Sequence, residues 1–164
     1  MGKQMTGSVR NIIIYILIVV TVGAIIYGVT AGSNQDEKFI QQSRQYRAAL
    51  ENMQAGQFGE AEKTFKQLLA VHQESYIVMW NCALSLLKQD KYDEAAQYFV
   101  KTQKQRPFVV REPRYLVEYG ETLYKQGQYP KAKRYLEEAK ELNAGPELLQ
   151  QVQPILTALE KNAR

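Results

Sequence analysis

A block of similar residues occurs three times in this chain of 164 residues, with intervals of 34 and then 37 residues between successive copies. Each block begins with an aromatic residue, carries alanine three positions later and has a large apolar residue seven positions later. The blocks are Phe58, Ala61 and Phe65; Tyr92, Ala95 and Phe99; and Tyr129, Ala132 and Leu136. A glycine or aspartate precedes each block by two residues, at Gly56, Asp90 and Gly127. Self-similarity at this period predicts one supersecondary unit that repeats and buries its apolar face against its neighbours.

The repeated unit resembles the tetratricopeptide repeat, whose second helix carries an alanine, a large apolar residue four positions later and often a proline at its end. Pro107 occupies that closing position once. The apolar spacing of three and four is typical of amphipathic helices. The resemblance implies an all-α fold, an α-solenoid of three helix-turn-helix repeats at residues 42–75, 76–109 and 113–146, with residues 110–112 as a short insertion. The alternative is an unrelated helical bundle with coincidental spacing.

The alanine of each block is expected where two helices cross, because only a small side chain lets their axes come within 8–10 Å. The large residue four positions later is expected to fill the space between neighbouring units. The leading helices of the second and third repeats keep the family spacing, with Met79, Cys82, Ala83 and Leu86, and then Leu116, Tyr119, Gly120 and Leu123. The first repeat has only Ala48, Ala49 and Asn52 there, so we expect an irregular leading helix or one packed against the preceding segment.

The last segment, residues 147–164, is predicted to form a capping helix over the open face of the third repeat. It supplies apolar residues at helical spacing: Leu148, Leu149, Val152, Ile155, Leu156 and Leu159. Pro154 is expected to kink or split this helix.

Before the repeats, residues 12–31 form 20 uncharged positions, of which 12 are Ile, Val or Leu. A helix of this length is about 30 Å long, the thickness of bilayer hydrocarbon, so we expect one transmembrane helix. Residues 1–11 are a short basic segment and residues 32–41 a polar linker. A signal peptide cleaved after Ala31 is the alternative, although its apolar region is typically 7–15 residues. A stripe of small residues, Ala24, Gly28 and Gly32, makes a homodimer possible.

Lys3 and Arg10 precede the apolar stretch, whereas Asp36 and Glu37 follow it closely, which favours a cytoplasmic amino terminus and extracytoplasmic repeats. The 133 residues after Ala31 carry 19 basic and 17 acidic groups, a balance too even to indicate nucleic-acid binding.

Single copies of cysteine and histidine, Cys82 and His72, argue against a disulfide framework, a histidine-based catalytic triad and a multi-histidine metal site. His72 is predicted at a helix end and Cys82 at a packing position between helices. No phosphate-binding loop or nucleophile motif is present in the sequence. We therefore expect no catalytic activity, no cofactor and no metal.

The resemblance implies that the first helices of the repeats line a concave groove that binds an extended peptide or a partner helix. The predicted groove residues are Ser43, Tyr46, Leu50, Met53, Ile77, Trp80, Leu84, Leu87, Lys88, Arg114, Val117, Glu121, Tyr124 and Lys125. Tyr46, Trp80 and Tyr124 are the expected anchors, because aromatic side chains offer a large rigid contact area. The alternative is that these residues pack within the superhelix.

Some family members clamp the carboxyl terminus of a chaperone with lysine and asparagine side chains. Asn81 and Arg114 match two of those positions, but Tyr46 and Leu50 stand where lysine and asparagine are needed. This departure indicates a more apolar ligand. A basic turn at residues 101–114 could meet an acidic partner or lipid headgroups, or be ordinary solvated surface.

These features predict a membrane-tethered scaffold for protein–protein interaction, an accessory or assembly subunit of a membrane protein complex. The alternative keeps the fold and reverses the topology, which gives a cytosol-facing receptor for incoming precursors, as in the mitochondrial outer membrane.

Overall fold

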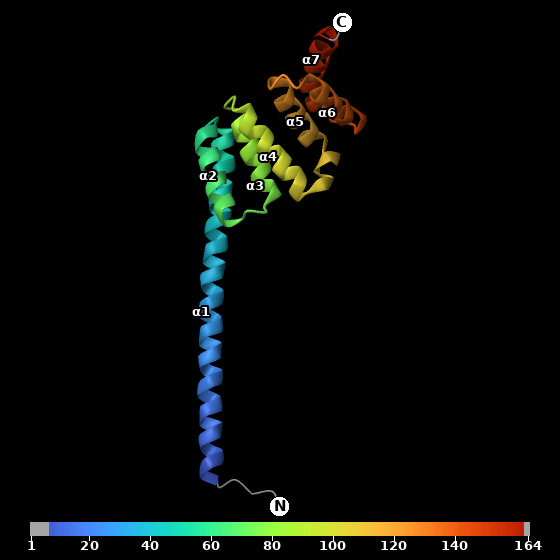
Figure 1. Cartoon of the computed structure of the whole chain (residues 1–164). Coiled ribbons are helices and arrows are strands. Elements are labelled where there is room, and N and C mark those ends of the chain that lie inside the picture. Colours follow the sequence, from blue (N-terminus) through green and yellow to red (C-terminus); the bar gives the residue numbers. More distant parts are fainter. Residues whose placement is uncertain (1–6, 163–164) are drawn as a thin grey trace, which may run out of the picture. The chain divides into compact units, whose positions relative to one another are not determined.

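The computed structural model describes residues 7–162, with no side-chain description for residues 7, 8, 10, 29–36 and 162. The described residues are helical apart from short turns and contain no strand, which confirms the all-α fold class (Figure 1). The chain divides into two compact units, Met1–Arg44 and Gln45–Arg164. The first six residues of the predicted basic segment, including Lys3, lie outside the described range.

The first unit contains most of α1, which runs from Gly7 to Gln54. Within it, Asn11–Gly28 is long and apolar enough to cross a membrane, and none of this stretch is buried. The hydroxyl of Thr21 donates to the carbonyls of Leu17 and Ile18, both at 2.9 Å, so the helix backbone itself satisfies this polar group. The segment 32–41, which we expected to be a linker, is helical and continuous with both neighbours.

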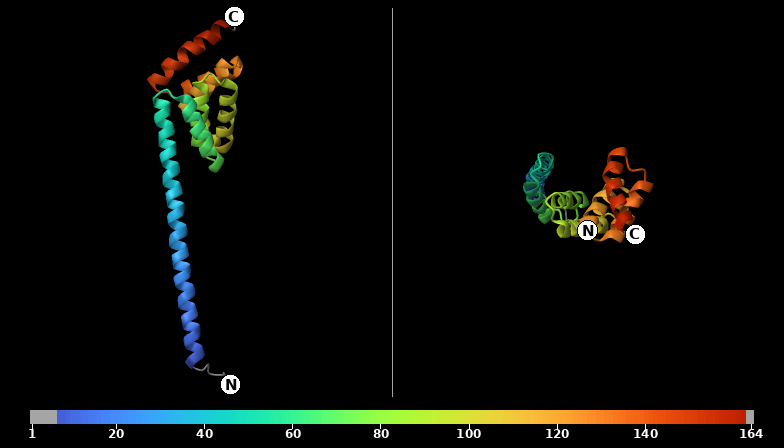
Figure 2. Two further views of the ribbon diagram at one scale, coloured as in Figure 1. Left: turned by 90° about the vertical axis from the view of Figure 1, so that its left-hand side faces the viewer. Right: turned by 90° about the horizontal axis from the view of Figure 1, so that it is seen from above.

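The second unit consists of the end of α1 and six further α-helices, joined by short turns (Figure 2). Their bounds are α2, Phe58–Val71; α3, Tyr76–Leu87; α4, Tyr92–Gln105; α5, Pro113–Lys125; α6, Tyr129–Glu141; and α7, Pro146–Asn162. A 3₁₀ turn, η1, covers Pro107–Arg111 and contains the first two residues of the predicted insertion 110–112, while Glu112 follows the turn. The α3–α4 and α5–α6 pairs form hairpins, and α2 and α4 contact the first helix of the following pair.

The periodic residues form the core of this unit, as predicted. The three alanines of the blocks, Ala61, Ala95 and Ala132, have no exposed surface, and neither do Phe65, Phe99 and Leu136. Each second helix therefore turns its small residue toward its partner helix and its large residue into the space between the repeats.

The turn between the two helices of each repeat has a left-handed backbone conformation. The φ angle is 75° at Gly56, 60° at Asp90 and 75° at Gly127. Glycine adopts this conformation without steric cost, and aspartate tolerates it better than most residues. The backbone geometry thus explains why glycine or aspartate precedes each block.

The leading helix of the first repeat is regular up to Gln54, so the expected irregularity is not found. Ala49 is fully buried, whereas Ala48 is exposed because no earlier repeat covers that side of the helix. In the third repeat, a Cβ atom on Gly120 would lie 2.7 Å from Cδ2 of Leu136. The absence of a side chain at Gly120 therefore lets α5 and α6 approach closely.

The capping helix α7 packs against α5 and α6, with Val152, Leu156 and Leu159 buried. The helix continues through Pro154 and is not split.

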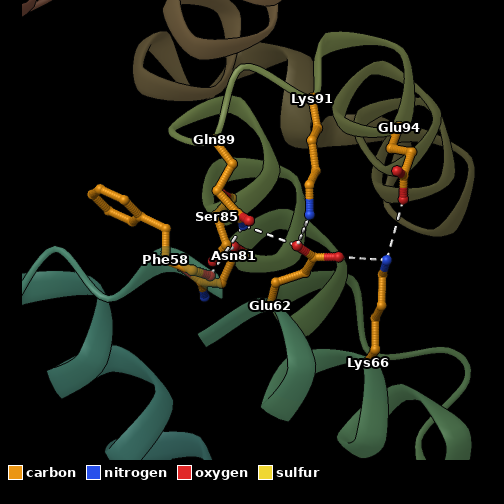
Figure 3. A network of polar contacts seen from close by, with 8 residues as sticks. All are labelled: Phe58, Glu62, Lys66, Asn81, Ser85, Gln89, Lys91 and Glu94. Carbon is orange, nitrogen blue, oxygen red and sulfur yellow. Dashed lines mark hydrogen bonds and ion pairs between the residues drawn. The ribbon is translucent and has the colours of Figure 1, made fainter. Parts of the chain in front are cut away.

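The boundary between the first two repeats is held by a buried carboxylate, Glu62, which has only 8% of its surface exposed (Figure 3). Its two oxygens accept hydrogen bonds from Lys66 at 2.6 Å, Lys91 at 2.8 Å and the amide of Gln89 at 2.9 Å. Lys66 also reaches Glu94 at 3.2 Å. Burial alone would raise the pKa of Glu62, but the hydrogen bonds from both lysines and Gln89 outweigh it and lower the pKa to about 2.

The boundary between the second and third repeats is aromatic. Phe99, Tyr115 and Tyr119 pack with ring centroids 5.3–5.9 Å apart, and Tyr135 lies 4.9 Å from Tyr119. The buried hydroxyl of Tyr115 donates to the carbonyl of Phe99 at 2.9 Å. The first boundary therefore adds a buried ion-pair network to its apolar core, whereas the second adds a cluster of aromatic rings.

Candidate functional site

The candidate site is the face formed by successive first helices: the end of α1 from Gln45, then α3 and α5. We call it the first-helix face. Side-chain hydrogen bonds connect these helices directly, from α1 to α3 and from α3 to α5. The bonds fix the positions of two of the three expected anchors, Tyr46 and Trp80.

Trp80 lies half-buried at the junction of α3 and α5. Its indole N–H donates to a carboxylate oxygen of Glu118 at 2.6 Å, and its ring packs edge-on against Tyr115 with centroids 5.7 Å apart. The other oxygen of Glu118 accepts from Nε of Arg114 at 2.8 Å. The Arg114 side chain is 68% exposed, whereas that of Glu118 is 12% exposed. A charged group at the surface is thus coupled through Glu118 to a positioned indole.

The carboxyl group of Glu118 is affected by opposing influences. Burial raises its pKa above the ordinary value. Hydrogen bonds from Arg114 and Trp80 and the positive charges of Arg114 and Lys88 lower the pKa, but by less than burial raises it. The same carboxyl group accepts hydrogen bonds from both Trp80 and Arg114 and so holds these two side chains next to each other.

Tyr46 and Asn81 make the equivalent link between α1 and α3. The Asn81 amide donates to the Tyr46 hydroxyl at 2.9 Å and to the Ile77 carbonyl at 2.9 Å. The Tyr46 ring also lies 6.0 Å from that of Phe65. Asn81, which resembles part of the family's carboxylate clamp, is therefore engaged with Tyr46 in this structure.

Three of the predicted groove residues are part of the core. Leu84 is 7% exposed, Leu87 is 4% exposed and Val117 has no exposed surface. Side chains of neighbouring helices cover them, so the interpretation of these three as ligand contacts is corrected in favour of packing within the superhelix. Leu50 and Met53 are half-buried against the same core.

Most of the remaining predicted residues lie elsewhere on the first helices or at their ends. Ile77 and Lys88 are exposed near the two ends of α3, and Ser43 belongs to the first unit. Tyr124 packs against Tyr129, with ring centroids 5.6 Å apart. Lys125 lines a shallow depression beside the α3–α4 turn, which also contains Asp90 and Asp93. The Tyr124 anchor thus lies at the α5–α6 turn, while Tyr46 and Trp80 are each bonded to a neighbouring first helix.

Sequence analysis did not identify Glu118. The available signal was a charged residue in a run of buried ones, Tyr115–Val117 and Tyr119–Gly120, four positions after Arg114 on the same helix. Glu62 was also not identified, and its one comparable signal is an oppositely charged residue, Lys66, four positions away on the same helix.

Cys82 and His72 lie where the sequence predicted. Cys82 is fully buried, and burial raises the pKa of its thiol to about 12, which leaves it unreactive at neutral pH. His72 follows the last residue of α2, and its backbone N–H donates to the carbonyl of Leu68. Among the residues that the structure describes, no group of three histidine, cysteine, aspartate or glutamate side chains is placed to hold a metal ion.

Two family models match the chain, and both describe the tetratricopeptide repeat. One matches residues 46–109 and the other residues 113–145, together more than half of the sequence. None of the curated proteins matches the sequence.

Solved structures with a similar fold include the type III secretion chaperone SycD of Yersinia enterocolitica, in complex with a peptide of the translocator YopD. It is 22% identical, with a TM-score of 0.64 over 74% of this chain and 94% of that chain. The TPR2B domain of yeast Sti1, in a pHsp70 complex, is 14% identical, with a TM-score of 0.62 over 75% and 98%. The Sgt2 TPR domain from Aspergillus fumigatus is 15% identical, with a TM-score of 0.61 over 75% and 79%.

Proposed function

Because this chain belongs to the tetratricopeptide repeat family, we propose that it acts by binding other proteins and not by catalysis. A peptide or helix of the partner lies against the first-helix face. Two of the solved structures with this fold hold peptides or segments of other proteins, SycD with a YopD peptide and Sti1 with pHsp70. This precedent supports a protein-binding role for the present chain.

The observation that carries the proposal is the arrangement around Trp80. Its indole is fixed by Glu118 and Tyr115 yet remains half-exposed, next to the exposed guanidinium of Arg114. A pre-positioned aromatic ring loses little conformational freedom on binding, and tryptophan and arginine are enriched among residues that dominate binding energy. The face therefore offers an apolar anchor with a neighbouring cation.

The second part of the proposal is that Asn11–Gly28 anchors the protein in a membrane as a single transmembrane helix. Tethering confines the repeats to one surface and raises their effective concentration toward partners on the same membrane. This suits a scaffold, assembly factor or accessory subunit of a membrane complex. We place the amino terminus in the cytoplasm and the repeats outside it, from the charges around the apolar stretch.

The alternative role as an organellar import receptor requires the opposite topology. Protease added to intact cells or organelles distinguishes the two. With intact cells, degradation of the repeats without lysis supports the extracytoplasmic placement. With isolated organelles, whose outer surface faces the cytosol, degradation without lysis supports the receptor, and protection until lysis contradicts it.

The binding face is tested by purifying the full chain in mild detergent and comparing bound partners between wild type and Trp80→Ala. We expect the variant to lose at least about tenfold in partner yield, because removing a central aromatic anchor typically costs 2 kcal/mol or more. Trp80→Phe keeps the ring packing but loses the bond to Glu118, and is expected to be intermediate.

Val100→Ala is the matched control, because Val100 is exposed on α4, outside the first-helix face. Unchanged partner yield with Trp80→Ala, in a variant that keeps its helical circular dichroism spectrum, would show that the first-helix face is not the binding surface.

A further inference from the structure

Exposed apolar side chains gather at one end of the helices in the second unit. Second helices run antiparallel to first helices, so the turns at residues 72–75, 106–112 and 142–145 all lie at the end where Gln45 enters the unit. We call this the entry end. The exposed large apolar residues on or beside these turns are Val71, Ile77, Phe108, Leu142 and Leu149.

The other exposed large apolar residues in the described part of this unit are Val100, midway along α4, and Tyr129, at the opposite end. The asymmetry is not a consequence of helix amphipathicity, because the apolar face of each helix is already buried in the core. The exposed large apolar side chains of this unit are therefore concentrated at the entry end.

The most prominent of these side chains is Phe108, which is 70% exposed in η1. Its neighbour Val109 is 1% exposed and packs into the core. The turn η1 contacts α4 and α5. The Arg111 guanidinium lies 5.8 Å from the centre of the Phe108 ring. The fold thus holds an aromatic ring outward on a short, well-packed turn.

The surroundings of Phe108 are basic. Lys101, Lys104, Arg106 and Arg111 are exposed, and Glu112 is the acidic residue of the turn. Arg106 is hydrogen-bonded to the Tyr76 hydroxyl and lies over its ring. The charge around Phe108 therefore suits an anionic surface.

We propose that the turn Pro107–Arg111 docks on the anionic headgroups of a lipid bilayer, with Phe108 in the interfacial layer and Lys104 and Arg111 near lipid phosphates. An aromatic ring surrounded by long cationic side chains suits the boundary between headgroups and acyl chains. The exposed apolar residues of the entry end are distributed over three separate turns, and Phe108 lies among basic side chains, which suits an extended anionic surface better than one shaped protein partner. The inference rests on the proposed membrane anchoring.

The test uses the full chain in vesicles of phosphatidylcholine, with and without phosphatidylglycerol, containing brominated phosphatidylcholine as a depth-dependent quencher of tryptophan. Phe108→Trp places a reporter at the turn, and Tyr129→Trp is the matched control, an exposed aromatic position at the opposite end. The wild-type protein, whose one tryptophan is Trp80, gives the background quenching that is subtracted from that of each variant. We expect Phe108→Trp to show roughly twofold more additional quenching than Tyr129→Trp when phosphatidylglycerol is present.

Combining Phe108→Trp with Lys104→Gln and Arg111→Gln, or raising the salt concentration, is expected to reduce the quenching, because attraction to the surface is screened. Additional quenching no greater than that of Tyr129→Trp would overturn the docking proposal and leave an acidic protein as the partner of the turn. Equal quenching without phosphatidylglycerol would also overturn it, since the headgroups would then have no role.

The same vesicles separate this inference from the anchoring on which it rests. Extraction of the chain from vesicles by alkaline carbonate would contradict the anchoring. The quenching pattern of the extracted protein on freshly added vesicles would still decide the docking. A chain that resists extraction but shows no preferential quenching would keep the anchor and refute the docking.

Discussion

Asp90 has the same left-handed conformation as Gly56 and Gly127, although it carries a side chain. Its carboxylate accepts a hydrogen bond from the Tyr92 hydroxyl two residues later, which supports the turn locally. Single residues at the helix-to-helix turns are therefore selected by backbone geometry, and the surrounding space matters little. A Cβ atom at Gly127 would meet nothing within 4 Å.

Two glycine-to-alanine substitutions are predicted to change stability in opposite directions. Gly127→Ala should lower the free energy of unfolding by about 1 kcal/mol, because an L-residue resists a φ of 75°. Gly59→Ala should raise it by up to about 1 kcal/mol, because Gly59 lies in the first turn of α2 and its Cβ would meet only Gln89 at 3.7 Å. Urea denaturation of the full chain in detergent measures both, and a shift of the same sign in both variants would contradict this account.

Helices of the same repeat type are joined by different chemistry at the two repeat boundaries. α2 reaches the α3–α4 turn through Glu62, whereas the corresponding bond at the second boundary joins the Gln126 amide to Asp93 at 2.8 Å on the surface. Both boundaries hold a shielded carboxyl group, but the pKa of Glu62 is lowered and that of Glu118 is raised, so ionisation stabilises only the first boundary.

Glu62→Gln is predicted to lower the free energy of unfolding by about 1–3 kcal/mol at neutral pH. The pKa of Glu62 falls from 4.5 to about 2 on folding, so its stabilisation is complete above pH 4.5 and is lost as the pH falls toward 2. The difference between wild type and variant should therefore shrink through this interval in denaturation experiments. Glu137→Gln is the control, because its ion pair with Lys133 is long at 3.7 Å and half-exposed, and it should change stability by less than about 0.5 kcal/mol.

The elements could be predicted from the sequence because their determinants are local and repeated. Ala61, Ala95 and Ala132, for example, lie at equivalent buried positions in successive repeats. The continuity of α1 could not be predicted, because Gly32, Ser33 and Asn34 are typical of a linker. The helix can nevertheless continue through them, because no proline interrupts it there. The Trp80–Glu118 bond joins residues 38 positions apart, so it depends on how two hairpins stack and leaves no periodic trace.

The whole second unit is expected to open from one side under acid. Below pH 4.5, opening of the first boundary lets Glu62 bind a proton that it resists in the closed boundary, where its pKa is about 2, so acid favours opening there. At the second boundary burial raises the pKa of Glu118, so acid does not favour opening there, and the aromatic contacts of Phe99 with Tyr115 and Tyr119 do not depend on acid. Arrays of repeats unfold according to the strength of their individual interfaces. Hydrogen exchange between pH 3 and pH 6 should thus show α2 losing protection before α5 and α6. Simultaneous loss across all helices would indicate a single cooperative unit with equal boundaries.

The capping helix α7 also limits how such a molecule can change in evolution. Val152, Leu156 and Leu159 occupy the surface on which a fourth hairpin would stack, and the opposite terminus is committed to the long helix α1. Lengthening the array by gene duplication must therefore insert new hairpins between existing ones, because neither end can accept an addition without losing its present neighbour.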